Sequence, residues 1–210
     1  MLHFTPPPYG VLFFFTCTIK KTMSKTKWRE HAENSCVRIE AYSTVIDFTR
    51  PDIVPRQGGG TGTGFFIPST GERNWYSILT CAHVVMGCHA SEICIIFPKY
   101  GRQKFKAVIQ SVCPDSDLAI VLTHIEDPTL QSMIEPMKMS SEMPVGCSVS
   151  AYGYPLGQWG LTGSTGEYGA FQSGQYQHNA DISPGNSGGP LIRNDTGAVS
   201  YTHLTLPTNR

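Results

Sequence analysis

The 210-residue sequence contains few charged residues and no excess charge of either sign. Asp, Glu, Lys and Arg together make up 15% of the chain, against about 25% in average soluble proteins, and their formal charges cancel. Low charge argues against a disordered or coiled-coil protein, and zero net charge gives no general attraction to nucleic acid or to an anionic membrane surface. Basic residues do exceed acidic ones near the N-terminus, which we interpret as a solvated arm.

Long apolar runs and paired cysteines are also missing. The apolar segment Val11–Ile19 is too short to span a bilayer, and its lysines follow it instead of preceding it as in a secretory signal. We favour a start at Met23, which opens a sequence typical of a soluble N-terminus, with residues 1–22 as an untranslated or disordered leader. A secretory signal is the alternative. The 7 cysteines are odd in number and form no CxxC pair, which fits neither a zinc site nor a disulfide framework. This usage favours an intracellular compartment over secretion.

Turn formers and short apolar segments are abundant. The chain has 21 glycines and 15 prolines, and 40% of its residues are hydrophobic, a composition typical of an all-β barrel or sandwich. Apolar alternation predicts strands over residues 37–48, 63–68, 75–81, 92–97, 104–112, 118–124, 144–152, 160–171, 175–182 and 189–193. Segment 125–143 has two prolines, many polar residues and no clear apolar period, so it is interpreted as a linker. This spacing favours two successive β-barrels, the first over about 35–127 and the second over about 144–198.

A serine lies in a glycine-rich turn within the second predicted barrel. In Asp181-Ile-Ser-Pro-Gly-Asn-Ser187-Gly-Gly-Pro190, the glycines around Ser187 allow a sharp turn that points successive backbone N–H groups into one concavity. Acyl transfer requires such a cradle, because the carbonyl oxygen becomes negative in the tetrahedral intermediate. We therefore expect the N–H groups of Gly185 and Ser187 to form an oxyanion hole.

Two polar residues lie at the ends of predicted apolar strands. His83 follows the strand over 75–81, and Asp117 directly precedes the strand over 118–124. A serine hydroxyl is a poor nucleophile until a base takes its proton, and that base must be held in one tautomer. His83 is the candidate base, Asp117 is the candidate group that orients it, and Ser187 is the candidate nucleophile.

These motifs resemble the trypsin-like serine peptidases, and most closely their HtrA/Deg branch. Gly62-Thr-Gly64, Leu79-Thr-Cys-Ala-His83-Val-Val, Asp117-Leu-Ala-Ile-Val and Gly185-Asn-Ser187-Gly-Gly-Pro stand in the order of the family, within about Cys36–Ala198. The resemblance implies two six-stranded-type β-barrels with the active site in the cleft between them. It also implies a serine endopeptidase with an acyl-enzyme intermediate, and the branch suggests a role in protein quality control.

The chain departs from the family at both ends. We expect residues 1–34 to be a leader or a disordered arm, before a protease domain over 35–198. Residues 199–208 match the translation of a transposase adapter used in sequencing libraries, so we interpret 199–210 as a non-native tail. It replaces the strand that the family has after Gly197. We therefore expect a truncated second barrel and a weakly active fragment.

Two residues compete for the specificity pocket that the resemblance implies. Asp181 lies six positions before Ser187, the offset of the carboxylate that selects Lys or Arg in trypsin. The HtrA/Deg relatives shape the pocket with the next residue, here Ile182, and prefer small aliphatic side chains. The closer overall resemblance favours the aliphatic preference, and the basic preference remains the alternative.

Three classes of function remain open. An active serine endopeptidase is favoured, because the candidate triad and the glycine-rich turn are complete. A peptide-binding adaptor with an impaired site and a chaperone-like protein are the alternatives. We expect no cofactor and no metal, because the other histidines have no metal-ligand spacing and Gly58–Gly64 matches no nucleotide-binding pattern. The expected partners are protein or peptide substrates, with no nucleic acid and no membrane span, and the sequence makes no prediction about oligomeric state.

Overall fold

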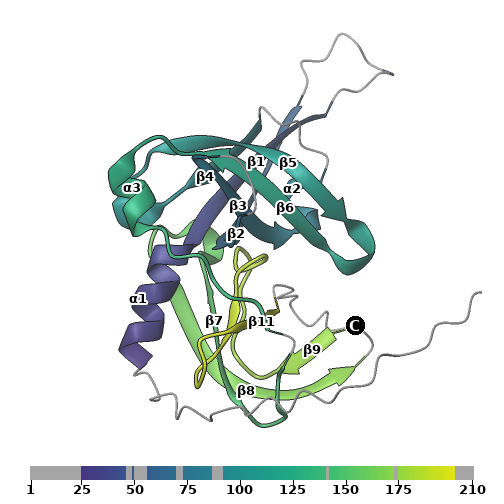
Figure 1. The fold of residues 1–210 in the computed structure, drawn as a ribbon. Helices are drawn as coiled ribbons and strands as arrows, with labels where there is room; N and C mark the ends of the chain where they lie inside the picture. Colours follow the sequence, from purple (N-terminus) through teal and green to yellow (C-terminus); the bar gives the residue numbers. More distant parts are fainter. Residues whose placement is uncertain are drawn as a thin grey trace, which may run out of the picture.

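The computed structural model describes residues 25–45, 49, 56–69, 73–86, 92–140, 142–172 and 175–201. Strands form two lobes, one above the other in Figure 1. The strands are β1 (Cys36–Val45), β2 (Arg56–Ile67), β3 (Trp75–Cys81), β4 (Ile93–Ile96), β5 (Lys104–Cys113), β6 (Leu118–His124), β7 (Ser148–Gly153), β8 (Thr162–Gln172), β9 (Gln175–His178), β10 (Leu191–Arg193) and β11 (Val199–Tyr201). The α-helices are α1 (Lys25–Ser35), α2 (Ala82–Val85) and α3 (Pro128–Met133), and the 3-10 turns are η2 (Pro98–Tyr100), η3 (Pro114–Ser116) and η4 (Pro155–Gly157).

The first lobe is a closed antiparallel barrel in the order β1-β2-β3-β6-β5-β4, which confirms the first predicted barrel. The pairing of β4 with β1 closes it, so the barrel has no free sheet edge. Alternate apolar side chains fill its interior, among them Ile39, Phe66, Ile78, Ile95 and Val121. The glycine-rich segment Gly58–Gly64 is part of β2, where it pairs with β1.

The second lobe is an open five-stranded sheet in the order β11-β10-β7-β8-β9. It matches the expected incomplete barrel in the described part of the chain. The fold was expected to end at Ala198, but β11 continues it to Tyr201, and Val199 is fully buried. The N–H of Val199 donates to Lys138 O at 2.9 Å, and the N–H of Ser140 donates to Val199 O at 2.8 Å. Residues 199–201, the first of the presumed tail, thus form a strand beside β10 where we expected the family's strand to be missing. The non-native origin of 199–210 stays a prediction.

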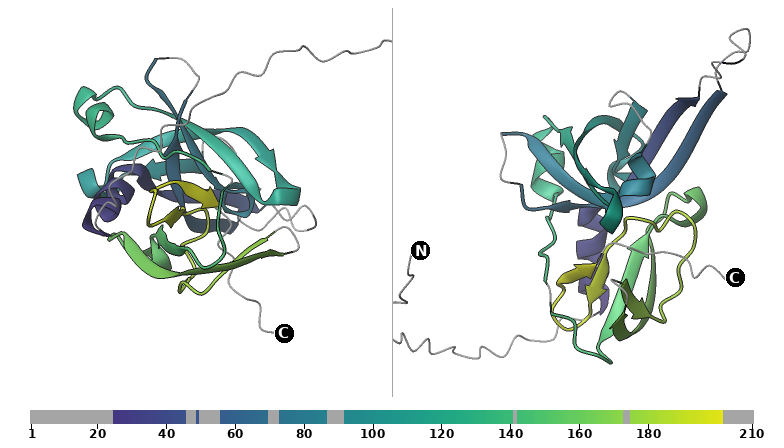
Figure 2. Two further views of the ribbon diagram at one scale, coloured as in Figure 1. Left: turned by 60° about the horizontal axis from the view of Figure 1, so that its bottom comes forward. Right: turned by 90° about the vertical axis from the view of Figure 1, so that its right-hand side faces the viewer.

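Two helices were not predicted. Residues 25–34 were expected to belong to a disordered arm, but they form most of α1, which lies along the second lobe (Figures 1 and 2). The indole Nε1 of Trp28 donates to Asn194 O at 2.8 Å, and a Cβ on Gly197 would lie 1.8 Å from the Trp28 ring. The helix α3 lies in the predicted linker, where the Asp127 side chain accepts the N–H of Thr129 at 2.8 Å as an N-cap. Residues 1–24 lie outside the described residues.

A buried cluster joins the two lobes and α1. It combines side chains of α1, β1, β2, β3, the segment after α3 and the second lobe, namely Ala32, Cys36, Phe65, Leu79, Met137, Tyr152, Tyr154, Ile192 and Val199. The hydroxyl of Tyr154 donates to Cys36 O across the interface at 3.2 Å. The barrel is therefore held against the second sheet by a shared apolar core.

Cationic side chains of the barrel hold the loop between β7 and β8. The guanidinium carbons of Arg38 and Arg102 lie 4.7 and 4.6 Å from the centroid of the Trp159 ring, and Arg38 also donates to Gly157 O. Glu40 lies 3.2 Å from Arg38 and 2.6 Å from the Lys104 ammonium. Burial acts to raise the pKa of the Glu40 carboxyl, but the hydrogen bonds and charges of its neighbours outweigh burial and lower that pKa below its usual range. The carboxylate therefore stays ionised beside Arg38 at neutral pH.

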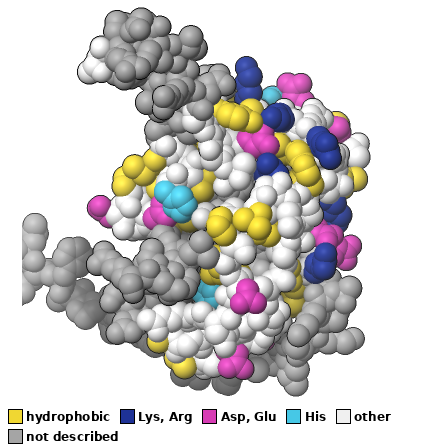
Figure 3. Space-filling view, turned by 180° about the vertical axis from the view of Figure 1, so that it is seen from behind, with side chains coloured by type: hydrophobic (Ala, Val, Ile, Leu, Met, Phe, Trp, Pro, Cys, Tyr) yellow, Lys and Arg dark blue, Asp and Glu magenta, His cyan; other side chains and the backbone are white. Residues whose placement is uncertain are grey.

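Charged side chains of both signs are interspersed on the face of the molecule seen in Figure 3. This agrees with the balanced charge of the sequence. Among the helices of the described segments, none has the length and apolar character that crossing a membrane requires.

Candidate active site

His83 and Asp117 meet where two neighbouring strands end. Cys81, the last residue of β3, pairs with Leu118, the first residue of β6. His83, two residues after Cys81, and Asp117, directly before Leu118, therefore lie at the same edge of the barrel. The Asp117 carboxylate accepts two hydrogen bonds from His83, one from the backbone N–H at 2.8 Å and one from Nδ1 at 2.7 Å. A carboxylate only accepts hydrogen bonds, so Nδ1 carries a proton and a neutral ring keeps its lone pair on Nε2.

The backbone holds Asp117 in an unusual conformation. Its φ and ψ are 48° and 43°, in the left-handed region that Asp tolerates better than most residues. Its N–H donates to Pro114 O at 3.0 Å, and its carbonyl accepts the N–H of Ala82 at 3.0 Å. The side chains of His83 and Asp117 are 49% and 20% exposed, so the imidazole is open to solvent and the carboxylate is covered.

The serine-containing turn is compact. The N–H of Asn186 donates to Ser183 O at 3.0 Å, and the N–H of Gly189 donates to Asn186 O at 2.8 Å. Gly185 has a φ of +99°, and a Cβ there would lie 2.6 Å from Tyr154 O, so the position requires glycine. The predicted sharp turn around Ser187 is present, and the Ser187 side chain is half-buried within it.

Thr63 ties this turn to the barrel. Its N–H donates to Ser187 O at 2.8 Å, and its hydroxyl donates to Gly185 O at 2.7 Å while accepting the N–H of Tyr154 at 3.0 Å. Sequence reasoning used Thr63 only as part of a motif and missed this role. The position of Thr63 between two glycines was the only available signal in the sequence, and it does not indicate which residues Thr63 would bond to.

The turn is seated close to the strand end that carries His83. A Cβ on Gly188 would lie 2.2 Å from Thr63 O, 2.3 Å from Thr80 Oγ1 and 2.9 Å from the backbone nitrogen of Cys81. The structure thus brings the Ser187–Gly188 backbone against Thr63 within β2 and against the end of β3. Within the described residues, no hydrogen bond joins Ser187 Oγ to His83 Nε2.

The two amides expected to form the oxyanion hole make no hydrogen bond within the described part of the fold. Among the hydrogen bonds of the described residues, the N–H groups of Gly185 and Ser187 donate none. Pro184, which precedes Gly185, is held by a hydrogen bond, because the N–H of Leu156 donates to its carbonyl oxygen at 2.7 Å. This contact links the turn to the loop that Arg38 and Arg102 hold.

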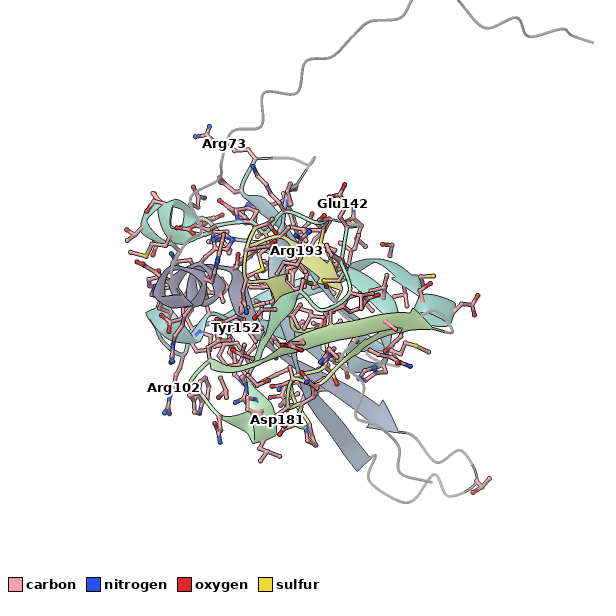
Figure 4. The ribbon with its side chains drawn as sticks, turned by 90° about the horizontal axis from the view of Figure 1, so that it is seen from below. Arg73, Arg102, Glu142, Tyr152, Asp181 and Arg193 are labelled. Atoms are coloured by element: carbon pink, nitrogen blue, oxygen red, sulfur yellow. The ribbon has the colours of Figure 1, made fainter. Side chains whose placement is uncertain are left out.

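Asp181 and Ile182 lie between β9 and the serine-containing turn. The side chain of Asp181, which Figure 4 labels, is exposed, and its carbonyl accepts a hydrogen bond from Ser164 Oγ at 2.6 Å. Ile182 is half-buried and packs against the core of the second sheet, formed by Val149, Ala151, Tyr168, Ala180 and Leu191. The apolar residue therefore faces the sheet, and the carboxylate faces solvent.

Comparison with known proteins agrees with this architecture. The model of the trypsin-like peptidase domain family matches residues 62–200. The Do-like 13 sequence of Arabidopsis thaliana is 28% identical over 221 residues, covering 100% of this chain and 43% of the relative. Protease Do-like 4, mitochondrial, and Protease Do-like 5, chloroplastic, of the same plant are 31% and 30% identical, covering 82% and 63% of this chain and 33% and 44% of their own. The chain spans less than half the length of these three relatives. With this match over most of its length, the chain belongs to the trypsin-like peptidase family, on the Do-like or HtrA/Deg branch.

Proposed function

We propose that the chain is a serine endopeptidase that cleaves protein substrates through an acyl-enzyme intermediate. Ser187 Oγ attacks the substrate carbonyl carbon while His83 Nε2 takes the hydroxyl proton. His83 then returns this proton to the leaving amine, and an ester on Ser187 remains. A water molecule attacks the ester by the same route, which releases the acid and restores the serine.

The observation that most supports this role is the double hydrogen bond between Asp117 and His83, at 2.8 and 2.7 Å. The bond to the backbone N–H fixes the carboxylate relative to the chain, and the bond to Nδ1 fixes the ring. Asp117 stabilises the imidazolium that forms when His83 takes a proton, and it keeps Nε2 as the basic nitrogen.

The amides of Gly185 and Ser187 are proposed to bind the oxyanion. They belong to a turn that Thr63 holds at two carbonyls, and neither N–H has a partner among the described residues. Donors fixed before the reaction need no reorganisation when negative charge develops on the carbonyl oxygen.

Labelling with a fluorophosphonate tests the proposal. We expect the intact chain to gain one covalent adduct on Ser187, located by peptide mass spectrometry, because only an activated serine attacks phosphorus rapidly. The Ser187→Ala chain is the control. An unlabelled but folded wild-type chain would contradict an active site and favour the peptide-binding or chaperone-like alternatives.

For the substrate, we propose a preference for small aliphatic side chains before the cleaved bond. Ile182 packs on the second sheet, whereas the Asp181 side chain is exposed to water, where a carboxylate attracts a Lys or Arg side chain weakly.

We expect Asp181→Ala to leave the cleavage preference unchanged on a peptide library, within about fivefold, as expected of an exposed charge whose interactions are worth about 0–1 kcal/mol. The exposed Asp115 provides the matched control, Asp115→Ala. A basic preference in the wild type that disappears in Asp181→Ala alone would show that Asp181 selects the substrate.

A further inference from the structure

Cys81 adds a sulfur atom to the His83–Asp117 pair. The thiol, the imidazole and the carboxylate each offer one donor atom, and these three atoms lie within 4.8 Å of one another. They come from one strand end, because Cys81 closes β3 and Asp117 precedes its paired residue Leu118. In the described part of the chain, no other group of three Cys, His, Asp or Glu side chains comes this close.

This donor set suits zinc. Zinc binds sulfur at about 2.3 Å and nitrogen or oxygen at about 2.0–2.2 Å, so two donors of one tetrahedral ion lie about 3.3–3.6 Å apart. Moving the cluster to these separations requires shifts of about 1 Å. Cys81 is fully buried, while the His83 side chain is 49% exposed, so an ion would enter from the His83 side and keep a water on its fourth position.

We propose that Cys81 Sγ, His83 Nδ1 and an Asp117 carboxylate oxygen form a reversible, inhibitory zinc site. Binding forms one bond from zinc to each of these atoms and releases water from the ion. One proton leaves Cys81 Sγ for solvent, and the proton of the neutral His83 ring moves from Nδ1 to Nε2 by exchange with solvent, so the ring stays neutral. The hydrogen bond between Nδ1 and Asp117 is replaced by bonds from each group to the metal.

Inhibition follows from the tautomer of His83. A neutral imidazole that binds zinc through Nδ1 carries its proton on Nε2. Nε2 is then a donor and does not accept the Ser187 proton. This consequence rests on the proposed peptidase function, whereas the binding of zinc does not.

Binding is tested on the full chain carrying Ser187→Ala, which prevents self-cleavage. Zinc is titrated by calorimetry, and cadmium is titrated while its thiolate charge-transfer absorption is recorded. We expect one site per chain with a cadmium–sulfur signal. In Cys81→Ala, zinc affinity should fall at least about 100-fold and the signal should vanish, because removing groups that only support a ligand already costs 10–100-fold.

The matched control is Cys113→Ser, an exposed cysteine that also pairs with Leu118 but lies outside the cluster. It should bind both metals like the parent. Cys81→Ser keeps nearly the same side-chain volume and replaces Cys81→Ala if that variant does not fold. Equal zinc affinity in the parent and in a folded Cys81 variant would overturn the proposal.

Activity is tested separately, as the ratio of rates with and without zinc within each variant. The chain with native Cys81 should lose activity at zinc concentrations near the calorimetric Kd, and Cys81→Ser should need about 100-fold more. Inhibition at the same concentration in both would overturn the inhibitory role. A chain that binds zinc as expected but has no peptidase activity without zinc would contradict the proposed function and leave the metal site standing.

Discussion

Replacing Ser187 by alanine is expected to lower kcat for peptide hydrolysis by about 10⁶-fold, because the members of a catalytic triad act as a unit and the loss of the nucleophile removes the covalent route. KM should change little, since the hydroxyl contributes to the reaction more than to substrate binding. Hydrolysis of a fluorogenic peptide by the purified chain, followed over hours, measures the remaining rate.

Ser183→Ala is the matched control for this variant. Ser183 lies in the same turn, and the hydrogen bond that it accepts from Asn186 uses its backbone carbonyl, which alanine also has. We expect near-parental activity in Ser183→Ala. Retention of more than a trace of activity in Ser187→Ala would show that another residue is the nucleophile.

Asp117→Asn is expected to lower kcat by about 10⁴-fold. The asparagine oxygen still accepts the backbone N–H of His83, so the fold around β3 and β6 is kept. Its amide donates to Nδ1, however, which places the ring proton on Nε2 and removes the basic lone pair. Steady-state kinetics should show the loss in kcat with KM nearly unchanged, and fluorophosphonate labelling of Ser187 should slow in parallel.

Asp115→Asn is the control, because Asp115 lies in the same η3 turn and its side chain is exposed. Thermal unfolding of both variants distinguishes a catalytic effect from loss of fold. A folded Asp117→Asn chain with parental kcat would show that the observed hydrogen bond does not orient the base.

Sequence periodicity was sufficient to predict the bounds of strands that have one face buried in the barrel and the other exposed. The strands over 75–81 and 118–124 have the bounds that alternation predicted, which places His83 just after one strand and Asp117 just before the other. Their contact needed only the neighbouring ends of two strands, a relation that the family resemblance supplied.

Features that depend on tertiary contacts were not predicted. The helix α1 buries few of its side chains, Trp28 and Ala32 among them, and α3 has only 6 residues, so neither shows a full apolar period. The hydrogen bonds of Thr63 join residues more than ninety positions apart, and the approach of Cys81 to Asp117 depends on strand register. Local pattern carries no information on such contacts.

The hydrogen bond between Trp28 and Asn194 joins parts of the domain that leave the ribosome at different times. All six strands of the barrel, and with them both His83 and Asp117, have been synthesised once His124 has emerged. The hydrogen bond of Trp28 forms only after Asn194, 166 positions later in the chain, has been synthesised. The turn that carries Ser187 and the seat of α1 are therefore completed in the same late stage of synthesis. A nascent chain holds its proposed base early and its proposed nucleophile last, which delays proteolytic competence until the second lobe has been synthesised.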